Sequence, residues 1–420
     1  MKYIFVIYLL IFTVVVGSAQ TEIDTAKYRL DYLIQSGIKI NSKLEPVEYQ
    51  RKIELIKIEQ SNKQPMPMFE FMVDYIPLEF NAKPEYDAFY SQRLVLPKKL
   101  EQSELSGQVK SKKQEIEKEK IRIDITRQIK LNYFTLYYFE RLALFNAEYQ
   151  KIMNSIIKSL EASYASGMGN QSQILKMNNE LQMLVLEQIE LEQSKKIYIN
   201  NLSVLSNTGL PVDFKTTGLE NVLSIFPELD SSKLISVMLS NNPEYKSIEN
   251  MIQEIQIDKN ISELERVPDI TLRGGYKYMA NDNIRFLTIG IGIDLPFMPW
   301  NSKRINAMVE EKNVMELQSL SMKSSMYQYM KTELQNMLAM IDILKQKIQY
   351  IREIYIPQVR QTFNSSMASY SSGAGEFMNL LDSYREMRKS DEMLIKEETE
   401  YLKQLSELEF LLGIPVSNIN

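Results

Sequence analysis

Two residue types that carry much enzyme and metal chemistry, cysteine and histidine, are missing from this chain. It contains no cysteine and no histidine among 420 residues. Thiol nucleophiles, imidazole bases, disulfides and imidazole or thiolate zinc sites therefore cannot be built. The formal net charge is −5, with 49 basic against 54 acidic residues, which offers no basic surface for nucleic acid. We therefore expect no enzyme and no cofactor, and favour a structural or conducting role.

Methionine is the other residue type with possible chemistry, since the chain has 23. Thioethers suit Cu(I), but methionine fills hydrophobic cores far more often. We therefore predict no metal site.

A fourteen-residue motif occurs twice, as ASYASGMGNQSQIL at Ala162–Leu175 and as ASYSSGAGEFMNLL at Ala368–Leu381. The shared positions include a tyrosine and two glycines: Tyr164, Gly167 and Gly169 in the first copy, and Tyr370, Gly373 and Gly375 in the second. The copies lie 206 residues apart, which is far longer than the period of a solenoid repeat. This spacing predicts a tandem duplication of one large unit.

Long helical segments precede and follow each copy of the motif. Apolar residues recur at three- and four-residue spacing from Lys98 to Tyr164 and from Ser302 to Tyr370, where Pro357 is the only interruption. A second helical stretch follows each motif, from Gln171 to about Leu205 and from Glu376 to about Leu412. Because glycine accepts the positive φ of a helix reversal, each motif is predicted to be the tip of a long helical hairpin.

Alternating segments precede each long helix and predict β-hairpins, at about residues 66–97 and 268–296. Apolar residues such as Leu287, Ile289 and Ile291 alternate with small or charged ones. The return strand of the first pair, from about Tyr86 to Leu96, alternates poorly because Gln92 and Arg93 are adjacent. The expected polar face carries five charged residues, Glu70, Asp74, Arg273, Lys277 and Asp294.

These strands have two interpretations. A half-buried sheet in a soluble protein is the commoner meaning of alternation. A lipid-facing sheet is favoured here because the apolar faces are rich in Phe and Tyr, and strands of about 10 residues can cross a bilayer. Four strands cannot close a barrel, and lipid tolerates no open sheet edge, so a membrane location would require oligomerisation.

The first nineteen residues have the layout of a secretory signal peptide. Lys2 precedes an apolar run from Tyr3 to Val16, and Gly17-Ser-Ala19 forms a small-residue cleavage site. A membrane anchor is the alternative, but the run is at the short end for a span. We expect an exported protein.

Together these motifs resemble the TolC-like outer membrane efflux protein family. The resemblance rests on Tyr164-Ala-Ser-Gly167 and Tyr370-Ser-Ser-Gly373, each followed by an apolar pair, and on the strand-end Leu-Pro pairs. It implies an α+β membrane protein with a signal peptide at 1–19 and repeats at 20–212 and 213–420, whose tips lie at about 164–169 and 370–375. In a homotrimer, three four-stranded contributions would form a twelve-stranded β-barrel in the outer membrane, continued by a helical periplasmic tunnel.

The resemblance also implies sites and partners. The tip residues Tyr164, Gly167, Gly169, Tyr370, Gly373 and Gly375 would dock a periplasmic adaptor, also called a membrane fusion protein, which links the duct to an inner membrane transporter of the resistance-nodulation-division type. Tyr370, Asn379 and Asp382 would gate the periplasmic end, and the five charged strand residues would line the barrel lumen. Segments such as Leu295–Arg304 look most like the heavy-metal efflux branch.

Plainer interpretations remain open at each site. The tip glycines could only reverse a helix, and Asp382 could only solvate a helix face. The chain as a whole could be a soluble periplasmic coiled-coil scaffold or adaptor, which would share the signal peptide and the long helices. We expect instead the exit duct of a tripartite efflux system, located in the outer membrane with a large periplasmic portion.

Overall fold

The computed structural model describes residues 29–74, 83–167, 169–217, 219, 230–280 and 282–419. The expected signal peptide at residues 1–19 lies outside them. The chain divides into two compact units. Unit 1 comprises residues 29–42, 121–242 and 330–420, and unit 2 comprises residues 43–120 and 243–329. Each unit takes segments from both proposed repeats, so the repeat boundaries stay a prediction.

Unit 1 is built from helices. They are α2 (Leu30–Ile40), the later part of α4 (Pro97–Ala165), α5 (Gln171–Ser206), α7 (Ser231–Asn241), the later part of α9 (Pro299–Tyr350), a π-helix η1 (Ile351–Tyr355), α10 (Ile356–Ser371), α11 (Phe377–Leu412) and the short 3-10 helix η2 (Val416–Asn418). The expected long helices and their returning partners are confirmed, with ends within a few residues of the predicted ones.

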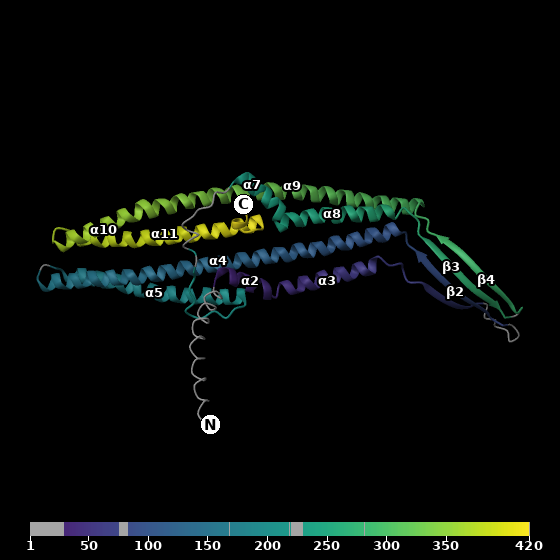
Figure 1. Ribbon diagram of the computed structural model, residues 1–420, viewed down its shortest axis with the longest axis horizontal. Coiled ribbons are helices and arrows are strands. Elements are labelled where there is room, and N and C mark those ends of the chain that lie inside the picture. Colours follow the sequence, from purple (N-terminus) through teal and green to yellow (C-terminus); the bar gives the residue numbers. More distant parts are fainter. Residues whose placement is uncertain are drawn as a thin grey trace, which may run out of the picture. The chain divides into compact units, whose positions relative to one another are not determined.

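Two helical hairpins lie side by side in unit 1, one formed by α4 and α5 and the other by α10 and α11 (Figure 1). Their shared core is apolar and closely packed. Met153 and Leu160 of α4 are buried there against Phe363 of α10 and against Leu380 and Tyr384 of α11. Burying such side chains contributes roughly 1.5–3 kcal/mol each, so this core holds the two hairpins together.

A local change of helix type separates α9 from α10. Proline has no backbone N–H, so Pro357 cannot make the bond that a continuous α-helix needs at that position. The preceding turn, Ile351–Tyr355, widens into a π-helix, and the N–H of Ile356 donates to the carbonyl oxygen of Ile351. The interruption expected at Pro357 is therefore a π-bulge within an otherwise helical run.

Unit 2 contains the only sheet in the described part of the chain. Its helices are α3 (Leu44–Ser61), the first part of α4, α8 (Pro243–Leu264) and the first part of α9, and its strands are β1 (Met68–Asp74), β2 (Glu85–Leu94), β3 (Ile270–Met279) and β4 (Ile284–Ile293). The sheet is antiparallel in the order β1-β2-β3-β4, so β2 and β3 join the two predicted hairpins. No helix in the described ranges is both long and apolar enough to cross a bilayer.

The second strand differs from its expected bounds. β2 begins at Glu85 and ends at Leu94, rather than running from Tyr86 to Leu96. Its weak alternation has a local cause, because Gln92 occupies the apolar face opposite Leu272. The Gln92 amide donates to the carbonyl oxygen of Pro65 at 2.9 Å, which satisfies its polar group beside the strand end.

Candidate functional site

The two hairpin tips have nearly the same backbone. Gly167 and Gly373 adopt φ values of 78° and 79°, a left-handed conformation that only glycine adopts without cost. In both tips the N–H of this glycine donates to the carbonyl oxygen of the motif tyrosine, Tyr164 or Tyr370, at 3.0 Å. The expected helix reversals are therefore confirmed, and the repeated motif specifies one turn geometry.

The second glycine of each tip is needed for a different reason. A Cβ at Gly169 would lie 2.8 Å from the backbone nitrogen of Tyr164, and one at Gly375 would lie 2.8 Å from that of Tyr370. Real Cβ atoms essentially never come that close to backbone. Each tip therefore brings its backbone unusually near its own tyrosine, and any side chain at this position must distort the turn.

The two tip tyrosines have different surroundings. The Tyr370 hydroxyl donates to Gln173 Oε1 of α5 at 2.9 Å, and its ring meets the edge of Phe377 at a centroid distance of 6.3 Å. Burial raises the pKa of Tyr370 above its ordinary value. Tyr164 is half exposed. Tyr370 thus ties the second tip to the first, whereas Tyr164 faces outward.

The three residues expected at the gate are not gathered at one point. Asn379 and Asp382 are exposed on α11, and the Asp382 side chain is 67% exposed with Arg385 at 3.8 Å. Tyr370 is directed instead toward Gln173 and Phe377. A gate role for this set in one chain would need further residues or further copies.

Polar contacts that sequence reasoning missed connect the two hairpins. Arg388 of α11 bonds Glu187 of α5 at 2.7 Å, and Arg385 pairs with Glu180. Deeper in the core, the Tyr149 hydroxyl donates to the buried carboxylate of Asp391.

The Asp391 carboxylate also has a cationic partner on the neighbouring helix. Arg360 of α10 pairs with Asp391 at 3.2 Å. Burial, followed by the bond to Asp391, raises the pKa of Tyr149 far above its ordinary value. The phenol therefore stays a donor, and α4, α10 and α11 are joined at one point.

The polar face of the sheet brings two of the expected lumen residues together. Arg273 pairs with Glu70 at 3.2 Å, and its guanidinium lies 4.1 Å from the centre of the Phe89 ring. The ring in turn covers Gly275, where a Cβ would lie only 2.3 Å from a Phe89 carbon. Glycine at this position therefore makes room for an aromatic ring that supports the charged pair.

Lys277 pairs with two carboxylates that the sequence interpretation overlooked. Its ammonium lies 2.5 Å from Glu85 and 3.8 Å from Asp87. Both acids flank Tyr86 on the polar face. Asp87 already lay within the expected strand, and extending the pattern by one residue toward the N-terminus would have added Glu85. Asp74 is half-buried beside this group, opposite Glu85 in the ladder.

The last expected lumen residue belongs to a cluster at the end of the sheet. Asp294 lies 3.5 Å from Arg93, but Arg93 makes its shorter bond, 2.7 Å, to Asp269. Lys99 also reaches Asp269, at 2.8 Å. Asp269 is buried and accepts from both cations, so this cluster fastens β2 and β3 to the start of α4.

The opposite face of the sheet is apolar and open. Its exposed side chains come from all four strands and include Phe69, Phe71, Tyr90, Leu94, Ile270, Leu272, Tyr276, Leu287, Ile289, Ile291 and Ile293. The ladder places them on one side, with Tyr276 opposite Leu287 and Leu272 opposite Ile291. An apolar patch of this extent is typical of a surface that contacts another protein, a membrane or a ligand. Within the described residues, no group of three or more acidic side chains could hold a metal ion.

Similarity to known proteins is evident in structure rather than in sequence. No family model and no curated protein matches the sequence. The chain is similar to CusC, whose crystal structures concern transmembrane channel formation, with a TM-score of 0.77, 15% identity and 92% of each chain covered. It is similar to the outer-membrane channel OprN, with a TM-score of 0.76, 14% identity, and 91% of this chain and 89% of that one covered.

A third similar structure is VceC, an outer membrane protein of Vibrio cholerae, with a TM-score of 0.72 and 13% identity over 92% of this chain and 96% of that one. The resemblance seen in the motifs thus holds at the level of the fold, over nearly the whole length of each chain. The protein therefore has the fold of TolC-like outer membrane channels.

Proposed function

We propose that this protein is the outer membrane exit duct of a tripartite efflux system, and that it conducts substrates passively rather than acting as an enzyme. In this proposal the four strands cross the outer membrane and the long helices enclose a periplasmic tunnel. An inner membrane transporter, of the resistance-nodulation-division type, supplies the energy. The likeness to outer membrane channels of the same fold supports this proposal.

The observation that carries the proposal is the two-sided sheet. One face presents exposed Phe, Tyr, Leu and Ile side chains, while the other carries Glu70, Arg273 and Lys277 in ion pairs. A soluble sheet would bury its apolar face against a core. A transmembrane barrel strand has the opposite arrangement, with apolar side chains toward lipid and polar ones toward a lumen.

The free edges of the sheet support an oligomer. β1 and β4 are the outer strands, and each has a partner on one side within the chain. Unpaired backbone groups cannot remain in hydrocarbon, because each costs several kcal/mol. We propose that the edges pair with neighbouring copies in a homotrimer, which gives a barrel of twelve strands.

The polar residues then acquire roles. Glu70, Asp74, Arg273, Lys277 and Asp294 would line the lumen, where Arg273 pairs with Glu70 and Lys277 pairs with Glu85. Asp382 would form a carboxylate ring with its copies near the periplasmic end, with Asn379 beside it and Tyr370 holding the tip. Such a ring attracts cations in a narrow mouth. The heavy-metal cargo suggested by Leu295–Arg304 stays a prediction, and unchanged copper and silver tolerance in a deletion strain would remove it.

The proposal is tested by fractionation of cells that express the full chain. We expect a detergent-dependent oligomer in the outer membrane fraction, whose mobility on denaturing gels changes after heating. The rival function, a soluble periplasmic scaffold or adaptor, would give a salt-soluble protein in the periplasmic extract. That result would overturn the duct proposal.

The tips offer a prediction about the adaptor. Gly375→Ala places a Cβ against the backbone of Tyr370, so the turn must shift at a cost of about 1–3 kcal/mol. If the tips dock the adaptor, this variant should assemble in the outer membrane but lose crosslinking to the adaptor and fall to the substrate tolerance of a deletion strain. Gly209→Ala is the matched control, because a Cβ there meets nothing within 4 Å. Full efflux by Gly375→Ala would show that tip geometry does not matter for docking.

A further inference from the structure

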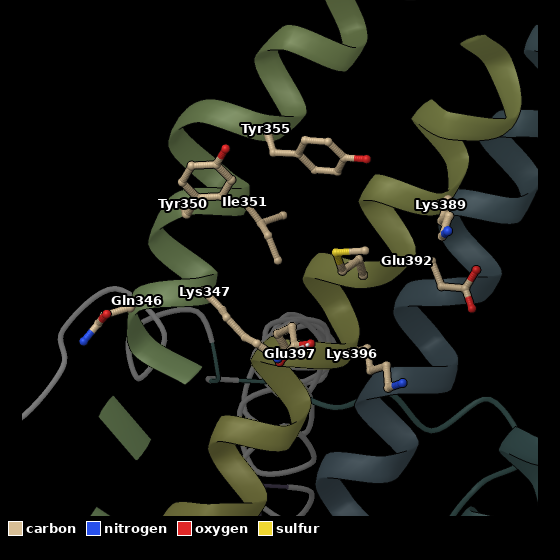
Figure 2. Close-up of a pocket in the computed structure, with 10 residues that line it drawn as sticks. Gln346, Lys347, Tyr350, Ile351, Tyr355, Lys389, Glu392, Lys396 and Glu397 are labelled. Carbon is tan, nitrogen blue, oxygen red and sulfur yellow. Dashed lines mark hydrogen bonds and ion pairs between the residues drawn. The ribbon is translucent and has the colours of Figure 1, made fainter. Parts of the chain in front are cut away.

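Arg285 of β4 is exposed, and its side chain makes no ion pair or hydrogen bond within the described residues. Cations on two other surfaces do have partners. In the groove between η1 and α11, which has a volume of about 770 Å³, Lys347 lies 3.4 Å from Glu397 (Figure 2). On the polar face of the sheet, Arg273 pairs with Glu70. The positive charge of Arg285 is therefore left for a partner outside the chain.

The ladder places Arg285 on the apolar face of the sheet. It stands opposite Tyr278, which stands opposite Tyr86 on the next strand. The alternation of the strand puts Leu287 and Ile289 on the same side as Arg285. Within the four described strands, no other residue on this face carries a charge. A partner of Arg285 must therefore combine an apolar part with a negative one.

The position of Arg285 along the strand indicates its depth in a membrane. Ile293, at the other end of β4, is eight residues away, which is about 26 Å along the strand. The apolar band of a transmembrane barrel is about 25 Å tall, and an arginine that faces lipid is costly at the midplane but nearly without cost at the surface. The helices adjoin the other end of the strands, so in the proposed duct Arg285 lies at the outer surface of the outer membrane.

Two tyrosines lie beside Arg285 at this level. The rings of Tyr86 and Tyr278 are stacked, with centroids 6.4 Å apart and an angle of 17° between their planes. The Tyr278 hydroxyl donates to Asn283 Oδ1 in the turn between β3 and β4, at 3.2 Å. Its side chain therefore extends toward the polar turn. Tyrosine is enriched where a membrane meets water, because its ring is apolar and its hydroxyl is polar.

We propose that Arg285 binds the phosphate of a glycolipid in the outer leaflet, with Tyr278 and Tyr86 beside the headgroup. The planar guanidinium can donate two parallel N–H bonds to phosphate oxygens. The acyl chains of the same lipid then lie on the apolar face, beginning at Leu287. This inference rests on the proposed duct, since only in an outer membrane does this end of the sheet meet phosphorylated glycolipids.

The site is tested by lipid binding to the purified full-length oligomer in detergent, measured by native mass spectrometry. The probes are bisphosphorylated lipid A, the same glycolipid without its phosphates, and phosphatidylglycerol. We expect the wild type to bind bisphosphorylated lipid A most tightly. Arg285→Gln should weaken that binding about fivefold, as expected for one cation near a lipid surface, and leave binding of the dephosphorylated glycolipid unchanged.

The matched control is Arg304→Gln. Arg304 is also exposed, but it belongs to α9, beyond the opposite end of β4. This variant removes the same charge from the chain and should bind bisphosphorylated lipid A as the wild type does. Equal weakening by Arg304→Gln and Arg285→Gln would show a general effect of charge and would refute the site.

Two further results overturn the inference without any variant. Equal affinity of the wild type for the phosphorylated and dephosphorylated glycolipids would exclude a phosphate site, and equal affinity for phosphatidylglycerol would exclude a glycolipid site. An oligomer in the outer membrane that gives either result would leave the duct proposal standing. A chain found only as a salt-soluble periplasmic protein would refute both proposals.

Discussion

If the protein is the duct proposed above, replacing Ile289 with arginine should remove it from the outer membrane. Ile289 lies near the centre of β4, is 81% exposed, and stands opposite Gly274 on the apolar face. If that face contacts lipid, an arginine at the bilayer midplane costs about 2–4 kcal/mol in each copy of the chain. Every copy in an oligomer bears this cost, so the heat-sensitive form in outer membrane fractions should be lost.

The adjacent residue gives the control. Thr288→Arg changes the same strand at the same depth but on the polar face, opposite Gly275. In a barrel this side chain would point into the lumen, so the variant should assemble and alter conductance instead. Normal assembly of Ile289→Arg, or equal loss in both variants, would show that the apolar face does not meet lipid.

Replacing Asp269 with asparagine should destabilise the junction between strands and helices. The carboxylate is buried and accepts from Lys99 Nζ at 2.8 Å and from the Arg93 guanidinium at 2.7 Å. A hydrogen bond to a charged group contributes about 1.5–3 kcal/mol, and the amide leaves Lys99 without its anionic partner. Thermal unfolding in detergent should therefore begin at a lower temperature. Asp294→Asn, whose side chain is exposed and lies 3.5 Å from Arg93, should change stability little.

The effect of Asp269 should depend on pH in a defined direction. Asp269 precedes β3 and lies outside the strands. Burial raises the pKa of Asp269, but the hydrogen bonds from Lys99 and Arg93 outweigh it and hold that pKa below the ordinary value of 3.8. The unfolded chain then binds the proton more readily, so this stabilisation is present above pH 3.8 and is lost as pH falls through the lower folded pKa. The difference between the wild type and Asp269→Asn should accordingly shrink in acid. A constant difference from neutral pH down to the acid limit would contradict this assignment.

The elements of the fold could be predicted because they depend on local patterns. Tyr-x-x-Gly motifs placed the tips, and alternation over Leu287–Ile293 placed β4. Which side chains meet across the fold depends on tertiary contacts, which the spacing of residues along the sequence does not predict. Gln173, which accepts from Tyr370, lies 197 residues earlier in the chain. The sequence could assign Tyr370 to a tip but not to this bond.

In the candidate sites, too, local patterns predicted which face a residue occupies but not which residue it pairs with. Placing Arg273 and Lys277 on one face followed from the two-residue period of a strand. Their partners Glu70 and Glu85 follow from the ladder register, which the turn and strand ends determine. The expected gate stays a prediction, because a tyrosine and an aspartate near one tip need not face the same direction within one chain. Asp382 is exposed on α11 while Tyr370 packs between helices.

The π-helical turn at Ile351–Tyr355 accommodates one residue more than a regular α-helix would hold between α9 and α10. One residue of ordinary helix corresponds to a rotation of about 100°. If the same residues formed a regular α-helix, α9 would be rotated about its axis by that amount relative to α10. The buried side chains of Leu344 and Ile348 would then turn toward solvent. Inserting one more residue here should therefore be more harmful than most substitutions, because it would rotate this row of buried side chains by about 100°.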